Sequence, residues 1–249
     1  MSKKTNYSYV GIAFIILLFG IIFVPKIIDR INEDDITRDD PRSEDVSKSS
    51  VEKNKSDLAY LEINGKPKKV PAFSFTNQDG KTITNKDYLG KVYVVEFFFT
   101  TCPTICPIMS RNLVEIQNEF TDFENFGVAS FSIMPLVDTP EVLKAYANKF
   151  GITNPNWNLM TGDYDDIEQL ANIGFNIFVG KTEDDFGFEH SGDFALIDKY
   201  GYFRSRKDDF GNPKIFYRGI ITEAQGVDED GFEQEITILK EDIAKLLKE

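Results

Sequence analysis

The alternation of hydrophobic and polar positions from residue 58 onward predicts short strands and longer helices. Residues Val92–Phe99 read VYVVEFFF, a β-branched and aromatic run that is almost entirely apolar. Such a run is typical of a central strand that is covered on both faces. Gly127–Ile133 and Asn158–Met160 are further strand candidates. The pattern also predicts two hairpins, over residues 73–84 and 194–204, each with a glycine in its turn.

Apolar residues at spacings of three and four predict helices between these strands. The first helix begins near Pro107, and its apolar face is expected to be Met109, Leu113, Ile116 and Phe120. A second begins at residues 138–141, where Asp-Thr-Pro-Glu supplies a cap, a first-turn proline and an early acid. Two more helices are predicted, over residues 163–173 and along the stripe Ile236, Leu239, Ile243 and Leu246.

The order of these elements predicts an α/β fold. Strands that alternate with helices favour a mostly parallel central sheet with helices on both faces, and the two hairpins add antiparallel strands at its edges. Residues 205–231 have little periodicity, so we expect a loop insertion there, within a domain of residues 58–249. Residues 29–57 are polar, mixed in charge and rich in serine, which predicts a flexible stalk.

The N-terminal residues have a different pattern. Tyr9–Val24 is apolar and uncharged, and with its flanks it approaches the roughly 20 residues that span a bilayer as a helix. Lys3 and Lys4 precede it, which favours keeping this end in the cytoplasm. No small-residue cleavage site follows, so we expect residues 1–28 to be a cytoplasmic tip and an uncleaved, single-pass anchor rather than a signal peptide. The domain would then lie in the periplasm, at the inner membrane of a bacterial cell.

Charge and cysteine content narrow the possible functions. The 249-residue chain has 28 Lys and Arg against 41 Asp and Glu, a net charge of −13 at pH 7. Nucleic-acid binding needs clustered basic side chains, so this charge excludes a nucleic-acid partner. The chain has only two cysteines, too few for a disulfide-scaffolded mini-domain, and a single histidine.

The two cysteines, Cys102 and Cys106, lie where the strand at 92–99 ends and a helix begins. Loops at the carboxyl ends of parallel strands are where such folds place their sites, and a helix N-terminus favours the thiolate form. Residues four apart on a helix have Cβ atoms roughly 5–6 Å apart, whereas a disulfide needs roughly 3.5–4.5 Å. A disulfide would therefore need a distorted first turn, while a metal could bridge the wider spacing. An inert buried pair is the alternative, but the flanking prolines and the predicted oxidising compartment favour a functional pair.

Two sulfurs and one imidazole form a soft ligand set of low coordination number, which suits Cu(I). The imidazole candidate is His190, just before the strand at 194–197 and beside a predicted loop at 180–189. A closed zinc site normally needs four protein ligands, and the chain offers neither a second histidine nor a third cysteine. Met109 and Met134 could add thioether ligands, although methionine more often fills gaps in a core.

At these residues the chain resembles the Sco/SenC family of membrane-anchored copper proteins, from Pro71 to Arg204 and in the anchor. The resemblance rests on the strand at 92–99 leading into Thr-Cys-Pro-Thr-Ile-Cys-Pro, on Phe131–Ile133, on residues 138–141 leading into Ala145-Tyr146, and on His190 ahead of 196–198. It implies a thioredoxin-like fold and a copper ion bound by Cys102, Cys106 and His190. It further implies assembly of the dinuclear CuA centre in the copper-site subunit of cytochrome c oxidase.

One departure from the family pattern follows Phe131–Ile133. The family often has Asp-Pro there, whereas this chain has Met134-Pro135, so a role for that Asp is not carried over. Asp138 is present further along.

Three functions fit these residues. The first is a copper metallochaperone, a binding function that uses Cys102, Cys106 and His190. The second is a thiol–disulfide oxidoreductase that would reduce the cysteines of the target copper site through Cys102 and Cys106. Thioredoxins have two residues between their cysteines and this chain has three, which favours the first function over the second. A thiol peroxidase of the same fold is a more distant third.

Overall fold

The computed structural model describes residues 17, 19, 57–180, 189–208 and 210–249. The chain forms two units, residues 1–50 and 51–249, and every strand and helix named below belongs to the second. Among the described residues, no helix is long and apolar enough to cross a bilayer. The predicted anchor at 1–28 and stalk at 29–57 lie outside these residues, except for Leu17, Phe19 and Asp57.

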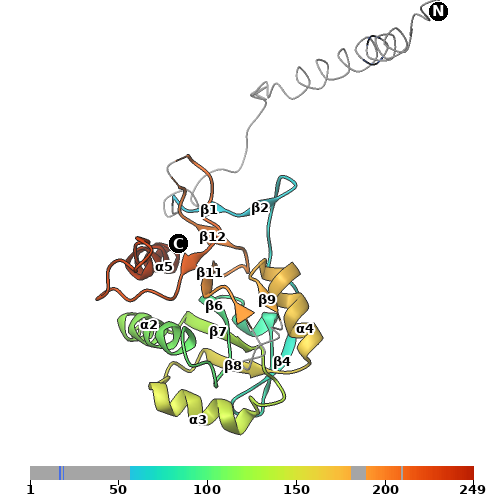
Figure 1. Ribbon diagram of the computed structural model, residues 1–249, viewed down its shortest axis with the longest axis vertical. Coiled ribbons are helices and arrows are strands. Elements are labelled where there is room, and N and C mark those ends of the chain that lie inside the picture. The colour runs from blue at the N-terminus through green and yellow to red at the C-terminus, as the bar shows by residue number, and fades with distance from the viewer. Residues whose placement is uncertain (1–16, 18, 20–56, 181–188, 209) are drawn as a thin grey trace, which may run out of the picture. The chain divides into compact units, whose positions relative to one another are not determined.

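A seven-stranded sheet forms the centre of the domain, in the order β13-β11-β6-β7-β8-β4-β5 (Figure 1). Its strands are β4 (Ser74–Asn77), β5 (Thr82–Thr84), β6 (Val92–Phe98), β7 (Phe126–Ser132), β8 (Trp157–Thr161), β11 (Asp193–Ile197) and β13 (Tyr217–Arg218). Three two-stranded pairs accompany it: β1 (Ala59–Tyr60) with β12 (Arg204–Ser205), β2 (Glu62–Ile63) with β3 (Lys66–Pro67), and β9 (Val179–Gly180) with β10 (Glu189–His190).

Helices cover both faces of the sheet, as predicted. They are η1 (Asn85–Tyr88), α2 (Cys106–Glu119), α3 (Pro140–Phe150), α4 (Tyr164–Gln169), its π-helical continuation η2 (Leu170–Phe175) and α5 (Ile236–Lys248). Figure 1 shows α2, α3 and α5 along one side of the sheet and α4 on the other. The expected face of α2 is confirmed, because its apolar residues are buried. The cap of α3 is confirmed too, since the Thr139 side chain accepts a hydrogen bond from the Val142 N–H.

The prediction of a mostly parallel sheet is wrong, because most neighbouring strands in the sheet are antiparallel. Only β6 with β7 and β7 with β8 pair in parallel, and the other neighbours are antiparallel. The chain enters β11 from β10, beside the carboxyl end of β6, because Ala195 pairs with Val95 and Ile197 pairs with Tyr93. A parallel neighbour of β6 would have to begin at the amino end of the sheet, so β11 runs antiparallel to β6.

Residues 205–231, expected as a loop insertion, contain an edge strand. Within this segment β13 pairs with β11, and the Tyr217 side chain is fully buried. The Tyr217 hydroxyl donates to Asp242 of α5 over 2.7 Å, and Asp242 also pairs with Arg206. The segment therefore joins the sheet to α5. Its lack of periodicity reflects a strand of two residues, too short to produce an alternating pattern.

Aromatic rings fill the space between the sheet and η2. Phe97 of β6 stacks on Phe131 of β7, with ring centroids 5.3 Å apart, and Phe175 of η2 lies 5.8 Å from Phe97. Successive residues of a strand point to opposite faces, so Phe98 faces α3 instead, 5.4 Å from the Tyr146 ring. Glu96 shares that face of β6 with Phe98, and it is a buried acid.

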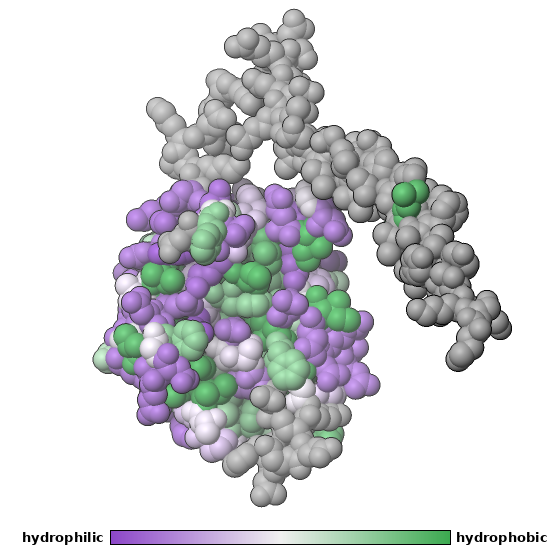
Figure 2. Space-filling model, turned by 45° about the horizontal axis from the view of Figure 1, so that its top comes forward, coloured by the Kyte–Doolittle hydropathy of each residue, from purple (hydrophilic) through white to green (hydrophobic). Residues whose placement is uncertain are grey.

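The surface of the domain is mixed. On the face in Figure 2, apolar side chains gather in the middle and polar side chains surround them. Among the described residues, the large apolar side chains with the greatest exposed fractions are Leu136 at 98%, Phe210 at 89% and Ile173 at 74%. Leu136 lies on the loop that follows β7.

Candidate metal centre

Cys102 and Cys106 lie on the connection that leaves the carboxyl end of β6. The Cys102 N–H donates to the Phe99 carbonyl over 3.3 Å, and α2 begins only at Cys106. The predicted junction of strand and helix is therefore confirmed, but the Cβ spacing of residues four apart on a helix does not apply to this pair, because Cys102 precedes the helix. Pro107 occupies the first turn of α2, where a missing N–H costs no hydrogen bond.

His190 reaches the cysteines from the opposite side, through the path of β10 and β11. In β10 it pairs with Val179 of β9, and the chain then turns at Gly192 into β11, beside β6. Gly192 has φ +73°, and a Cβ there would lie 2.4 Å from the Ile220 side chain, so only glycine fits this turn. The antiparallel course of β11 thus places His190 at the carboxyl end of β6.

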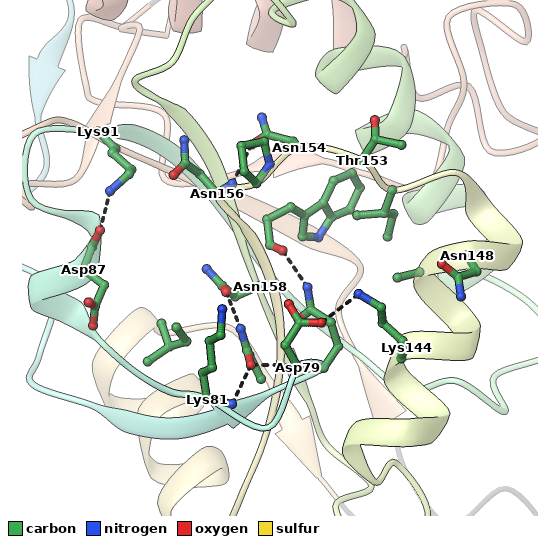
Figure 3. Close-up of a pocket in the computed structure, with 17 residues that line it drawn as sticks. Asp79, Lys81, Asp87, Lys91, Lys144, Asn148, Thr153, Asn154, Asn156 and Asn158 are labelled. Atoms are coloured by element: carbon green, nitrogen blue, oxygen red, sulfur yellow. Dashed lines mark hydrogen bonds and ion pairs between the residues drawn. The ribbon is translucent and has the colours of Figure 1, made fainter.

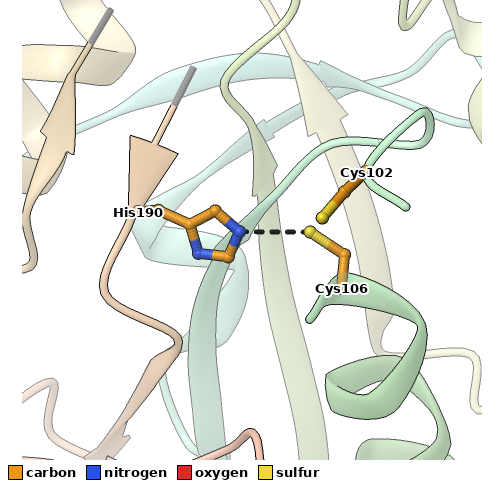
Figure 4. A group of neighbouring side chains, drawn as sticks. All are labelled: Cys102, Cys106 and His190. Carbon is orange, nitrogen blue, oxygen red and sulfur yellow. Dashed lines mark hydrogen bonds between the residues drawn. The ribbon is translucent and has the colours of Figure 1, made fainter. Parts of the chain in front are cut away.

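The three side chains meet in one buried cluster. Their ligand atoms, two Sγ and one imidazole nitrogen, all lie within 4.8 Å of one another. The Cys106 Sγ is 3.1 Å from the His190 Nε2, and Figure 4 shows the two sulfurs facing each other beside the ring. Exposed fractions are 7% for Cys102, 0% for Cys106 and 7% for His190. Cys102 and Cys106 form no disulfide with each other.

Asp138 fixes the loop that carries Cys102. It is fully buried just before α3, and its carboxylate accepts hydrogen bonds from the Thr100 N–H over 3.0 Å, from the Thr100 hydroxyl, and from the Ser132 hydroxyl over 2.5 Å. These bonds tie the end of β6 to the end of β7. The sequence signalled Asp138 only as part of a helix start, so its role in positioning Cys102 was missed.

The pKa values of the two thiols are shifted in opposite directions. Hydrogen bonds from the Cys106 thiol, from His190, and from the backbone N–H groups of Cys106 and Thr104 hold the pKa of Cys102 well below its usual range. The same bond to Cys102, together with burial, raises the pKa of Cys106. These shifts favour the thiolate on Cys102 and the protonated thiol on Cys106. The sequence predicts that this helix start favours a thiolate, and these hydrogen-bond donors are the reason.

A buried acid lies near this pair. Burial raises the pKa of Glu96 to about 7. The Ser130 hydroxyl donates to the Glu96 carboxylate over 2.6 Å, and this hydrogen bond acts in the opposite direction by lowering the pKa. The Trp157 indole N–H in turn donates to the Ser130 oxygen over 2.9 Å. A Glu96 carboxylate would further raise the pKa of Cys106, so the centre is sensitive to the charge at this position.

These residues fit a soft metal ion. Thiolate and imidazole donors suit Cu(I), which accepts two or three ligands, whereas a closed zinc site needs a fourth protein ligand. Among the residues that the structure describes, this cluster is the only group of three or more His, Cys, Asp or Glu side chains that could hold a metal. Met109 is fully buried, as expected of a core residue, and Met134 is half-buried beside Thr101.

A polar cavity of about 380 Å³ lies at the amino ends of the central strands, away from the cysteines (Figure 3). Asn77 is its most buried polar side chain, and its amide donates to the Asn158 side chain over 2.8 Å. The side-chain oxygen of Asn77, Oδ1, accepts from the N–H groups of Asp79 and Lys81. Lys144 pairs with Asp79 over 2.7 Å. These side chains are engaged in holding the β4–β5 turn, which gives the cavity a structural role.

The fold and the cluster together define a class: a thioredoxin-like α/β protein with a Cys-x-x-x-Cys pair and a distant histidine at one soft-ligand centre. Within this class the chain belongs to the SCO1/SenC family, whose sequence model matches residues 62–225, more than half of the chain. The resemblance seen in the sequence is therefore confirmed. The match also extends over most of residues 205–231, the expected insertion.

Known proteins of this family resemble the chain closely. The SCO1 protein homolog of Bacillus subtilis is 33% identical over 159 residues, 63% of this chain and 81% of that protein. A SCO1/SenC family lipoprotein from Bacillus anthracis is 33% identical and superposes with a TM-score of 0.58, covering 72% of this chain and 94% of the other. BsSco, described as having a disulfide switch and as belonging to a family of cytochrome c oxidase assembly proteins, is 26% identical with a TM-score of 0.57, covering the same shares.

Proposed function

We propose that this protein is a copper metallochaperone that binds Cu(I) through Cys102, Cys106 and His190. The observation that carries the proposal is the convergence of two thiol sulfurs and one imidazole nitrogen within 4.8 Å. This donor set is soft, of low coordination number and nearly buried, which favours Cu(I) over harder divalent ions. Burial also limits access of water and oxygen to the bound ion.

The family supports a specific target. BsSco is described as belonging to a family that assembles cytochrome c oxidase, so we propose that the chain delivers copper to the CuA centre of that enzyme. Delivery to such a centre requires a location outside the cytoplasm. The apolar N-terminal stretch supports a single-pass anchor in the inner membrane, with the domain in the periplasm. Membrane fractionation, with protease digestion of intact spheroplasts, tests this location: digestion of the domain without lysis is expected, and full protection contradicts it.

The binding test uses the full-length protein in detergent, reduced and titrated anaerobically with Cu(I). One copper per chain is expected, with tight binding in the wild type and weaker binding in His190→Ala. Lys144→Ala, which changes a side chain at the polar cavity, is the matched control and should bind as the wild type does. If His190→Ala binds copper as tightly as the wild type, the three-ligand site is wrong.

A second function rests on a separate observation. Cys102 lies just ahead of the first turn of α2, and its lowered pKa favours the thiolate, which is the form that attacks disulfides. A disulfide switch is described for BsSco. The chain could therefore reduce the cysteines of the target copper site, either before or instead of delivering copper.

The rate of thiol–disulfide exchange distinguishes the two functions. Thiol–disulfide exchange can be followed with a peptide that carries the disulfide form of a two-cysteine copper site, with and without Cu(I) on the protein. Fast exchange that bound copper blocks would favour the reductase. Slow exchange together with tight copper binding would favour the chaperone.

A further inference from the structure

Met134 is a methionine in an unusual position. Met109 and Met160 are fully buried, whereas Met134 is half-buried on the loop that follows β7. Its backbone is fixed: the Met134 N–H donates to the Ser132 hydroxyl over 3.1 Å, and its carbonyl accepts from the Asp138 N–H over 2.9 Å. The main chain is thus held in place, while the unbranched side chain retains three rotatable bonds.

The sulfur of Met134 lies against the cysteine loop. The Thr101 hydroxyl donates to the Met134 Sδ over 3.5 Å, and Thr101 immediately precedes Cys102. The bonds from Thr100 to Asp138 hold the two loops together at this point. A soft thioether therefore contacts the residue that precedes Cys102.

Several residues around this position are exposed. Cys106 is fully buried, but the side chains next to Cys102, Thr101 and Pro103, are exposed, and so is Leu136 on the Met134 loop. An ion that enters on this side meets Cys102 before it meets Cys106. Thioether sulfur is a preferred ligand of Cu(I), and it carries no charge that would hold the ion permanently.

We propose that Met134 is an exchange ligand, which holds Cu(I) beside Cys102 as the ion enters or leaves the three-ligand site. The proposal deepens the proposed function and rests on it. It assigns Met134 to the path of the ion and leaves the resting site to Cys102, Cys106 and His190.

The exchange conserves charge and oxidation state. Cu(I) on a donor first bonds to the Cys102 thiolate and to the Met134 thioether, and the donor's ligands leave. The Cys106 sulfur then bonds to copper and releases its proton to the solvent, and the His190 nitrogen displaces the thioether. Copper stays Cu(I) throughout, no electron is transferred, and release reverses these steps.

The test compares exchange rates with equilibrium affinity. Full-length reduced protein loaded with one Cu(I) is mixed anaerobically with the chromophoric chelator bicinchoninate, and copper loss is followed by stopped-flow absorbance. Uptake is measured in the opposite direction. Met134→Leu keeps the size and apolar character of the side chain but removes the sulfur. Met160→Leu makes the same chemical change in the buried β8 and is the matched control.

Met134→Leu should slow both release and uptake by about tenfold, at the low end of the effects seen for groups beside a metal. Its equilibrium affinity should stay at the wild-type value, because the resting ligands are unchanged. Rates equal to those of Met160→Leu would overturn the proposal. A Cu(I) affinity of Met134→Leu that falls as much as its exchange rates would also overturn the proposal, since Met134 would then be a permanent ligand. Wild-type protein that takes up no Cu(I) would overturn the proposed function itself, before any variant is compared.

Discussion

The metal centre and the polar cavity lie at opposite ends of the same central strands, and they use polar side chains differently. In the cavity, Asn77 and Asn158 bond to each other, and Asn77 also holds the turn after β4. At the metal centre, the three side chains mainly face one another. The cavity has a volume of about 380 Å³, but Asn77, Asn158, Lys144 and Asp79 in it are already engaged in the fold.

This difference shows that a hollow is a weaker guide to function than the state of its groups. A buried donor that the fold already uses has little left to offer a ligand. The thiols of Cys102 and Cys106 are buried, free and unequal in acidity, so they keep their capacity to bind a metal.

Cys106→Ser should lower Cu(I) affinity by about a hundredfold or more, since loss of a group that merely supports a metal ligand already costs up to that amount. The hydroxyl has nearly the size of the thiol but is a hard donor. Competition with a Cu(I) chelator measures the effect. Unchanged affinity in Cys106→Ser would show that copper binds elsewhere.

Asp138→Ala should destabilise the protein by about 3 kcal/mol, because it leaves the buried Ser132 hydroxyl and the partly buried donors of Thr100 without their acceptor. It should also weaken copper binding, since the loop that carries Cys102 loses its attachment to β7. Urea unfolding and chelator competition on the same protein measure the two effects. A loss of stability with full copper affinity would mean that Asp138 does not position Cys102.

Glu96→Gln should make stability less dependent on pH. The pKa of Glu96 is raised to about 7 in the fold from a usual 4.5, so its contribution to stability is present in full below pH 4.5 and is lost as the pH rises through 7. The neutral amide avoids this loss, and at about pH 8 the variant should be more stable by about 3 kcal/mol. Urea unfolding at about pH 5 and pH 8 measures the difference. A variant with the same pH dependence as the wild type would contradict the assignment.

Asn77→Ala should destabilise the protein by about 2 kcal/mol, because it removes buried hydrogen bonds to the β4–β5 turn. Copper affinity should not change, because the residue lies at the other end of the strands. Lys144→Ala is the matched surface control in the same cavity, and loss of its exposed ion pair with Asp79 should cost about 0.5 kcal/mol or less. A drop in copper affinity in Asn77→Ala would show that the two ends are coupled.

Local patterns in the sequence were enough to predict the elements that carry the cysteines. The run at 92–99 became the buried β6, the spacing of Met109 and Leu113 matched the core face of α2, and Thr139 capped α3. Each of these features depends on neighbours within a few residues, where strand and helix periodicities are fixed by the backbone. The cysteine pair is recognisable for the same reason, because both residues lie in one short segment.

The tertiary structure alone decided what surrounds that pair. The sequence identified His190 as the imidazole candidate, because it is the single histidine of the chain. Only the antiparallel course of β11 beside β6 brings it to the cysteines. Asp138 and Met134 reach the Cys102 loop because β7 lies next to β6. Such contacts join residues that are 30 or more positions apart. They depend on the path of the whole chain, which no local periodicity encodes.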